Sequence, residues 1–142
     1  MPVTHLLDTS VYSQRLKPQP HLHAISRWDQ LGDSQVVTST ICEAEVLFGI
    51  AKKGSTRLAT AFSANLRPRL AILPLDSACA AAYAQLRAAC ERNGTPVGDM
   101  DLLIAATAKA NNLIVATLNT NHFHAIPGLT VEDWGAPSPP FS

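Results

Sequence analysis

The sequence predicts an α/β fold, a three-layer arrangement with helices on both faces of a central parallel sheet of four or five strands. Four short apolar segments have the length and composition of buried strands: residues 3–7, 36–38, 71–75 and 113–117. Helical segments separate them, and this alternation favours parallel pairing, because helices then cover both faces of the sheet. We expect one domain over residues 1–134 and a flexible Pro-rich tail at residues 135–142.

The first half of the chain follows this alternation in order. Two prolines within residues 17–20 end the first helix, and residues 21–31 form a second helix before a Gly-Asp-Ser turn. The second strand, at residues 36–38, is rich in β-branched side chains. Ser39 or Thr40 then begins the next helix.

The second half contains the longest helices. Asp76 is expected to cap an Ala-rich helix that runs from Ser77 to about Arg92, where Asn93-Gly94 ends it. The strand at residues 113–117 is the clearest in the chain, and residues 129–131 form a short last strand.

Residues 98–110 combine two acids with an almost unbroken apolar run. A helix that is apolar on every side is buried, and a buried carboxylate without a partner is costly. Asp101 therefore needs a partner, which is either the free N–H groups at the helix start or a metal cation. The alternative is that Asp99 caps the helix and Asp101 is an ordinary first-turn acid.

Further acids are expected near the same end of the sheet. Asp8 follows the first strand and Asn119 follows the fourth, and ligands of parallel sheets bind beyond the carboxyl ends of strands. Right-handed crossovers place the starts of the helices that carry Glu45 and Asp101 at this end as well. The alternative for Asp8 is that it only caps the next helix.

Glu45 is the more promising of two neighbouring glutamates. Ile41, Glu45 and Phe48 share one helix face, which places Glu45 on the apolar side, whereas Glu43 points elsewhere and is expected to be solvated. A glutamate on the inner face near a helix start is unusual, so Glu45 is a candidate functional residue.

Carboxylates that converge in one cleft repel each other, so either their pKa values rise or a cation neutralises them. All-oxygen ligands favour Mg²⁺ or Mn²⁺ over zinc. Such an ion lowers the pKa of a bound water and holds phosphate oxygens, and a second ion would stabilise the leaving oxygen. This chemistry suits hydrolysis of a phosphodiester.

Composition excludes several other classes of protein. Lys and Arg total 11, as do Asp and Glu, and this zero formal charge argues against a simple electrostatic nucleic-acid binder. The three cysteines lack metal-site spacing and are typical of reduced cytosolic thiols. No apolar run reaches membrane-span length and no export signal is evident, so we expect a cytoplasmic protein without membrane association.

Two local clusters of polar residues have alternative interpretations. His122 and His124 could bind a metal, but no third ligand is evident, and such pairs usually bind nothing. The only dense basic region, which includes Lys52, Lys53 and Arg57, is either a solvated helix face or a rim that contacts phosphates.

Four motifs in order resemble those of the PIN-domain family, and most closely the VapC toxins of bacterial type II toxin–antitoxin pairs. They are Leu6-Leu7-Asp8-Thr9-Ser10, residues 45–50, residues 101–108 and residues 115–123. Each motif alone is weak, but the four in this order and at these separations are specific. The resemblance covers nearly the whole chain and implies a PIN-like α/β/α fold.

The resemblance also implies an activity and a set of partners. It implies a Mg²⁺- or Mn²⁺-dependent endoribonuclease with one or two ions, acting on RNA such as tRNA or rRNA. It further implies a homodimer that a VapB-like antitoxin neutralises by inserting a C-terminal segment near the active site. Asp8, Glu45 and Asp101 fall on the family's acidic metal-site positions, and Ser10 and Thr117 fall on polar positions beside them.

One departure from the family pattern bears on the number of metal ions. Many members carry a fourth acid where this chain has Asn119, and Asp99 is the candidate replacement. Asn119 and the zero net charge motivate a second hypothesis, a catalytically silent PIN module that binds RNA or a protein partner.

Overall fold

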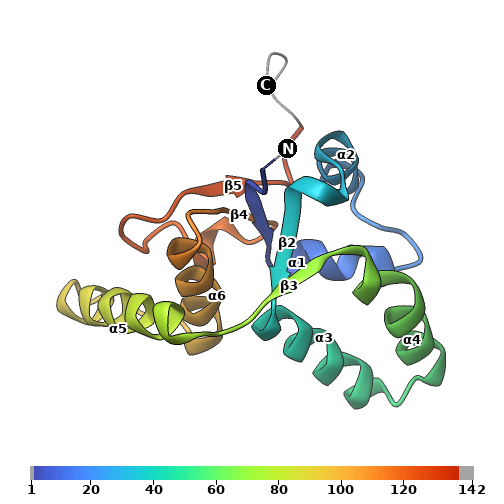
Figure 1. Cartoon of the computed structure of the whole chain (residues 1–142), viewed down its shortest axis with the longest axis horizontal. Coiled ribbons are helices and arrows are strands. Elements are labelled where there is room, and N and C mark those ends of the chain that lie inside the picture. Colours follow the sequence, from blue (N-terminus) through green and yellow to red (C-terminus); the bar gives the residue numbers. More distant parts are fainter. Residues whose placement is uncertain (1, 138–142) are drawn as a thin grey trace.

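Five parallel strands form one sheet in the order β3-β2-β1-β4-β5 (Figure 1). The computed structural model describes residues 2–137, so residues 138–142 of the expected tail lie outside the described part. The strands are β1 (His5–Leu7), β2 (Val36–Ser39), β3 (Ala71–Leu73), β4 (Ile114–Thr117) and β5 (Val131–Asp133). Because β1 lies at the centre, the carboxyl ends of β1, β2 and β4 are neighbours.

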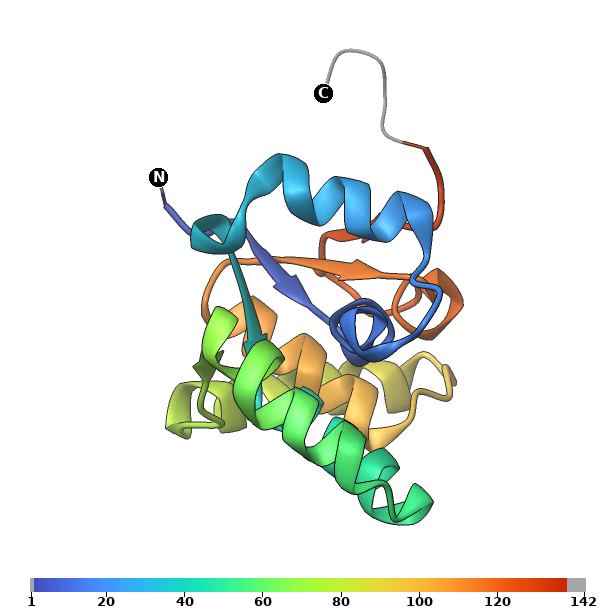
Figure 2. The same ribbon diagram turned by 90° about the vertical axis from the view of Figure 1, so that its right-hand side faces the viewer.

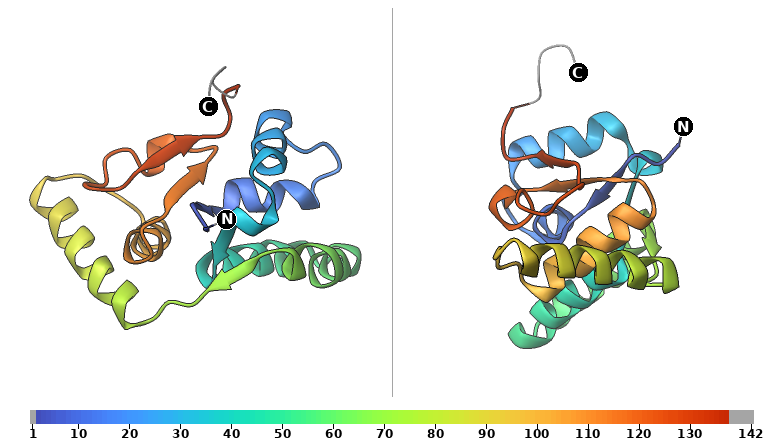
Figure 3. Two further views of the ribbon diagram at one scale, coloured as in Figure 1. Left: turned by 45° about the horizontal axis from the view of Figure 1, so that its top comes forward. Right: turned by 90° about the vertical axis from the view of Figure 1, so that its left-hand side faces the viewer.

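Helices cover both faces of this sheet. Those in the first half of the chain are α1 (Thr9–Tyr12), α2 (Leu22–Leu31), α3 (Thr40–Lys53) and α4 (Thr56–Ala61). Those in the second half are α5 (Ser77–Arg92) and α6 (Asp99–Ala110). Figure 3 shows α1 to α4 on one side of the sheet and α5 with α6 on the other, and Figure 2 shows β1 between α2 and α6. The three-layer α/β/α prediction is confirmed.

Short turns complete the connections. Three-residue and four-residue 3-10 turns lie at Ser13–Leu16, Asp33–Gln35, Arg67–Arg69 and Thr120–His122, and a π-helical turn lies at Phe62–Leu66. Ser39 and Asp76 cap α3 and α5 by accepting bonds from backbone N–H groups three residues later, as expected. Among residues 2–137, the structure contains no helix of the length and apolarity that crossing a lipid bilayer requires.

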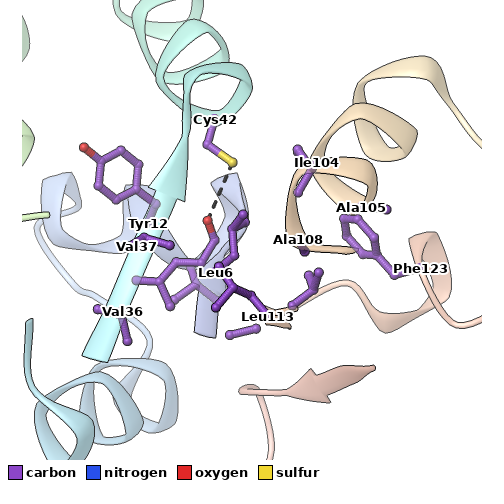
Figure 4. Packing of buried hydrophobic residues seen from close by; sticks show 14 of the residues in the cluster. Leu6, Tyr12, Val36, Val37, Cys42, Ile104, Ala105, Ala108, Leu113 and Phe123 are labelled. Carbon is purple, nitrogen blue, oxygen red and sulfur yellow. Dashed lines mark hydrogen bonds between the residues drawn. The ribbon is translucent and has the colours of Figure 1, made fainter. Parts of the chain in front are cut away.

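The core explains why α6 is apolar on nearly every side. Buried side chains of α6 pack beside the central strand, and Figure 4 shows Ile104, Ala105 and Ala108 beside Leu6 and the phenyl ring of Phe123. The Cys42 thiol donates a weak bond to the backbone carbonyl of Leu7 at 3.6 Å (Figure 4). Small residues along α6 therefore allow this helix to approach the sheet closely, and its N-terminal turn reaches the carboxyl end of the strands.

The expected apolar face of α3 is wrong. Cys42, Val46 and Ile50 form the buried stripe, whereas Phe48 is 67% exposed. Glu45 therefore lies beside the core stripe rather than within it. The choice of stripe failed because residues 41–50 contain enough apolar side chains to fit more than one helical face.

Two further expectations need correction. The Glu43 side chain is only 13% exposed and pairs with Arg67 at 2.6 Å, so it is not a solvated acid. The last strand, expected at residues 129–131, is Val131–Asp133 and includes two acids. Glu132 can occupy a strand because His5, Arg27 and Trp134 contact its carboxylate.

Candidate active site

Asp8 occupies the junction between β1 and α1, and its carboxylate is held entirely by neutral donors. Oδ1 accepts hydrogen bonds from Ser10 Oγ at 2.6 Å and from the Val11 N–H at 3.1 Å, so Asp8 is the N-cap of α1. Oδ2 accepts a bond from Thr117 Oγ1 at 2.5 Å. Burial raises the pKa of Asp8, the three hydrogen bonds oppose this rise, and the charge of Asp101 adds to it.

Two hydroxyls fix this carboxylate to the end of β4. Ser10 Oγ donates to Asp8 and accepts from the Leu118 N–H at 2.9 Å. Thr117 Oγ1 donates to Asp8 and accepts from the Asn119 N–H at 2.8 Å. Ser10 and Thr117 therefore hold Asp8 where the ends of β1 and β4 meet, in agreement with their expected supporting positions.

Asp101 lies in the first turn of α6, beside the same strand ends. The N-cap of α6 is Gly98, which offers no side chain, so Asp99 is the first helical residue rather than the cap. Burial raises the pKa of Asp101, and the charge and hydrogen bond of His122 oppose this rise. Its Oδ2 lies 3.2 Å from His122 Nδ1. Asp101 is therefore more than an ordinary exposed first-turn acid.

Glu45 reaches the site from α3. Its Oε1 accepts a hydrogen bond from Thr9 Oγ1 at 2.5 Å, which ties the middle of α3 to the first residue of α1. Glu45 is thus linked to Asp8 through α1, because Thr9 is the first residue of this helix and Asp8 is its N-cap.

These side chains line one cleft of about 350 Å³. Its lining includes four acids and two further polar side chains: Asp8, Glu45, Asp99, Asp101, Asn119 and His122. The sequence predicted Asp8, Asn119 and the starts of the helices that carry Glu45 and Asp101 at this end of the sheet. Within residues 2–137, however, no three His, Cys, Asp or Glu side chains lie close enough together to hold an ion by themselves.

The donor chemistry of the cleft suits a hydrated hard cation. The pKa values of Asp8 and Asp101 are both raised, which means that their charged forms lack sufficient compensation within the protein. Mg²⁺ and Mn²⁺ prefer oxygen ligands, and Mg²⁺ retains several waters instead of requiring a complete protein cage. Carboxylates that share a cleft without forming a closed cluster are consistent with such an ion.

Asp99 has partners on α5. Its Oδ1 accepts from Tyr83 Oη at 3.2 Å and lies 3.4 Å from Arg87 Nη1. Although Asp99 lines the cleft, its carboxylate is engaged by this neighbouring helix. This arrangement argues against Asp99 as a replacement for a missing fourth acid.

His122 is the residue of the cleft that sequence reasoning did not select as a site residue. It ends the 3-10 turn Thr120–His122, which Leu118 and Asn119 separate from β4. His124, by contrast, contacts the Thr120 carbonyl at 3.2 Å and does not line the cleft. The polar run after β4 was the available signal, but it did not indicate which histidine turns inward.

A basic groove of about 390 Å³ joins the cleft, sharing Thr9 and Glu45 with it. Lys17, Lys53 and Arg57 line this groove together with apolar residues of α3 and α4. The expected basic region is thus divided, because Lys52 is exposed but does not line the groove.

Comparison with known proteins agrees with this architecture. A family model described as PIN domain matches residues 5–129. A tRNA(fMet)-specific endonuclease VapC of Salmonella typhimurium is 34% identical over 129 residues, which cover 91% of this chain and 96% of the relative. The toxin FitB of Neisseria gonorrhoeae is 36% identical over 135 residues, covering 91% and 97% of the two chains.

Solved structures show the same likeness. The crystal structure of FitAcB from Neisseria gonorrhoeae matches with a TM-score of 0.84 and 34% identity, covering 92% of this chain and 98% of that one. A member of the VapBC family of toxin–antitoxin systems, VapBC-5 from Mycobacterium tuberculosis, matches with a TM-score of 0.67 and 29% identity, covering 93% and 98%. The chain therefore belongs to the PIN-domain family, in the branch that contains the VapC and FitB toxins.

Proposed function

We propose that this protein is a metal-dependent endoribonuclease toxin that hydrolyses RNA phosphodiesters, with tRNA or rRNA as the substrate. The observation that carries the proposal is the single cleft that Asp8, Glu45 and Asp101 line beyond the carboxyl ends of the strands. The similarity to a tRNA(fMet)-specific endonuclease supports the RNA substrate and the hydrolytic reaction.

Asp8, Asp101 and Glu45 are the residues that would hold one or two Mg²⁺ or Mn²⁺ ions. When bound, such an ion supplies Lewis-acid chemistry, because it lowers the pKa of a water and neutralises charge on phosphate oxygens. Ser10 and Thr117 position the Asp8 carboxylate through the hydrogen bonds described above. The amide of Asn119 lines the cleft without adding charge, so the negative charge of the site rests on the acids.

The basic groove beside the cleft supplies a path for a polyanion. Lys53 and Arg57 lie in the groove that ends at Glu45, so phosphates of an RNA bound there would approach the acids from the cationic side. The acids themselves repel RNA, and the cations of the groove offset this repulsion. We further propose that a VapB-like antitoxin places its C-terminal segment in this groove and excludes RNA.

A homodimer completes the proposed toxin. Leu47 and Phe48 are consecutive residues of α3, and their side chains are 47% and 67% exposed. Side chains of this kind commonly mark protein interfaces. We propose that this part of α3 contacts a second copy of the chain, and replacement of Phe48 by Asp is expected to shift the mass measured by light scattering to that of a monomer.

The decisive experiment compares three near-isosteric variants with wild type. Asp8→Asn, Glu45→Gln and Asp101→Asn should each abolish cleavage of total cellular RNA and relieve growth arrest on expression, while circular dichroism shows folded protein. Glu91→Gln is a matched control, because this acid lies on the surface of α5, 70% exposed. Retained cleavage by all three site variants would refute the proposal.

The same assay tests the alternative of a catalytically silent module that binds RNA or a protein. The absence of a closed three-residue ligand cluster among residues 2–137 favours that alternative. Cleavage that Mn²⁺ supports and EDTA stops would exclude it. RNA binding without cleavage at any metal concentration would establish it in place of the nuclease.

A further inference from the structure

We propose that a second hollow of this protein, beyond the basic groove, anchors phosphates of the RNA that lie away from the cleaved bond. This distal pocket measures about 440 Å³, and its basic lining residues are Arg15, Lys17, Arg57 and Arg69. The inference rests on the proposed function, because it names a further contact that the same RNA substrate makes. Lys17 and Arg57 also line the groove, whereas Arg15 and Arg69 do not.

The distal pocket concentrates positive charge in a chain that has none overall. The chain has 11 Lys and Arg side chains and 11 Asp and Glu side chains, so its formal charge is zero. Four of the basic side chains line this pocket, and no acid among residues 2–137 belongs to its lining. A concave surface lined by charges of one sign focuses their field, so the pocket attracts an anion although the whole protein is neutral.

Trp28 holds the two arginines that line the distal pocket but not the groove. The guanidinium carbons of Arg15 and Arg69 lie 4.4 and 5.3 Å from the centroid of the Trp28 ring, which is fully buried. A guanidinium suits phosphate oxygens because several N–H groups point in one plane, and a stacked arginine loses little freedom when it binds. The ring therefore positions two phosphate-binding groups in advance.

The aspartates that pair with these arginines lie outside the pocket lining. Arg15 pairs with Asp29 at 2.5 Å, and this carboxylate is 61% exposed. Arg69 pairs with Asp33 at 3.0 Å, and this carboxylate is 38% exposed. Arg15 Nε is buried without a hydrogen-bond acceptor among residues 2–137, so Asp29 does not satisfy this guanidinium completely. Ion pairs with solvated acids contribute little free energy, and they leave both arginines able to bind a phosphate.

Lys17 and Arg57 connect the distal pocket to the cleft. Both residues are exposed, and neither forms an ion pair with an acid among residues 2–137. They lie where the pocket meets the groove, and the groove meets the cleft at Thr9 and Glu45. The three hollows are therefore continuous, with the acids at one end and the stacked arginines at the other. An RNA chain that is cut at the cleft would place phosphates further along its length in the distal pocket.

The lining of these hollows favours contacts with phosphates over contacts with bases. Within residues 2–137, no Phe, Tyr or Trp side chain lines the distal pocket, the groove or the cleft. Single-stranded RNA commonly stacks its bases on aromatic side chains, whereas phosphate contacts fix position and carry no sequence information. The distal pocket should therefore increase affinity for longer RNA without selecting a sequence.

Fluorescence anisotropy of a labelled RNA oligonucleotide of mixed sequence, in EDTA to prevent cleavage, tests the anchor. Arg69→Gln should weaken binding severalfold and reduce the slope of log affinity against log salt concentration by about 0.7, the change expected for one phosphate contact on a single strand. Arg67→Gln is the matched control, because it also removes one charge and one ion pair but lies outside the pocket lining. It should bind RNA as wild type does.

A second pair of variants decides the question if Arg69→Gln fails to fold. Asn65 is exposed and lines the distal pocket, so Asn65→Asp adds repulsion there without removing a cation. It should weaken RNA binding severalfold, whereas Ser63→Asp, exposed in the same turn but outside the lining, should not. Hydrolysis of bis(p-nitrophenyl) phosphate, a phosphodiester too small to reach from the cleft to the distal pocket, should keep its wild-type rate in all four variants.

The outcomes separate the anchor from the proposed function. If Arg69→Gln and Asn65→Asp bind RNA as tightly as their controls, the anchor is overturned, while EDTA-sensitive RNA cleavage by wild type would still support the nuclease. Slower hydrolysis of the small phosphodiester in Asn65→Asp would also overturn it, because the effect would then lie in the cleft. Unchanged RNA affinity with weaker binding of an antitoxin would assign the pocket to a protein partner instead. Weaker RNA binding in both variants, with no cleavage by wild type, would keep the anchor and refute the nuclease.

Discussion

The carboxylates on and beside this sheet fall into two groups, which differ in whether positively charged side chains lie next to them. Glu132 in β5 is surrounded by donors, because its Oε1 lies 2.8 Å from His5 Nε2 and 3.1 Å from both Arg27 Nη2 and Trp134 Nε1. Burial alone would raise the pKa of Glu132, but the hydrogen bonds of Trp134 and His5 and the charges of His5 and Arg27 outweigh it and lower the pKa.

Asp8 has as many hydrogen bonds but no cation. Its donors are the hydroxyls of Ser10 and Thr117 and one backbone N–H, and burial together with the charge of Asp101 raises its pKa. The difference is therefore the charge of the partners rather than their number. A carboxylate with internal cations stabilises the fold, whereas one without them favours a cation from outside.

The largest expected effect follows from replacing Asp8, the carboxylate that has no cationic partner. Asp8→Asn should lower RNA cleavage by about a thousandfold, because it removes a charge from the reacting site. It should leave the free energy of unfolding nearly unchanged, since the amide carries no buried charge and keeps an acceptor for Ser10 and Val11 but no longer accepts from Thr117. Cleavage assays and urea denaturation on one preparation measure both quantities. If Asp8→Asn lost stability and retained cleavage, Asp8 would belong with the carboxylates that stabilise the fold.

Replacement of Glu132, the carboxylate with cationic partners, should change stability and leave cleavage unaffected. Glu132→Gln should lower the free energy of unfolding by about 1 to 2 kcal/mol, because it removes the charge from three hydrogen bonds at a partly solvated position. The cleavage rate per folded molecule should not change. Glu91→Gln, on the surface of α5, should change stability by less than about 0.5 kcal/mol. A comparable loss in both variants would show that the Glu132 cluster has no special role.

Glu132 and Asp8 should change the free energy of unfolding in opposite directions as the pH rises. The lowered pKa of Glu132 means that its contribution is present above its ordinary value of 4.5 and is lost as the pH falls through its folded pKa. The raised pKa of Asp8 means that stability present below 3.8 is lost as the pH rises through its folded pKa.

Urea denaturation in EDTA at a series of pH values measures these slopes. The destabilisation caused by Glu132→Gln should disappear at low pH, whereas any stabilisation by Asp8→Asn should appear only as the pH rises above 3.8. Difference curves that run parallel for the two variants would contradict the comparison.

The sequence was sufficient for the first four strands and for the positions of Asp8 and Asp101, since these depend on local signals. Apolar runs that end in polar residues located β1 and β4, and the rule for parallel sheets then placed Asp8 and Asn119 at one edge. The uniform apolar character of α6 correctly indicated a buried helix that carries Asp101 into the site.

The failures depended on side-chain direction and distant partners. Glu43 is partly buried and pairs with Arg67, and Glu132 lies within a strand because residues far away in sequence, His5 and Arg27, supply its donors. The inward turn of His122 depends on one 3-10 turn after β4, which composition alone does not specify. Such features arise from tertiary contacts and have no periodic signal in the sequence.

The smallest expected effect concerns the cations of the groove that adjoins the cleft. Lys53 and Arg57 line the adjoining groove, and under the proposed function they contact the RNA and do not neutralise the acids. Arg57→Gln should therefore weaken RNA binding severalfold and reduce the salt dependence of binding by about one counterion, with little effect on the maximal cleavage rate. Lys52→Gln is the matched control, since this neighbouring lysine lies outside the groove and should leave binding unchanged. Fluorescence anisotropy with labelled RNA over a range of salt concentrations measures the slope. Equal slopes in the two variants would mean that the groove has no role in RNA binding, and a fall in the maximal rate alone would place Arg57 with the acids instead.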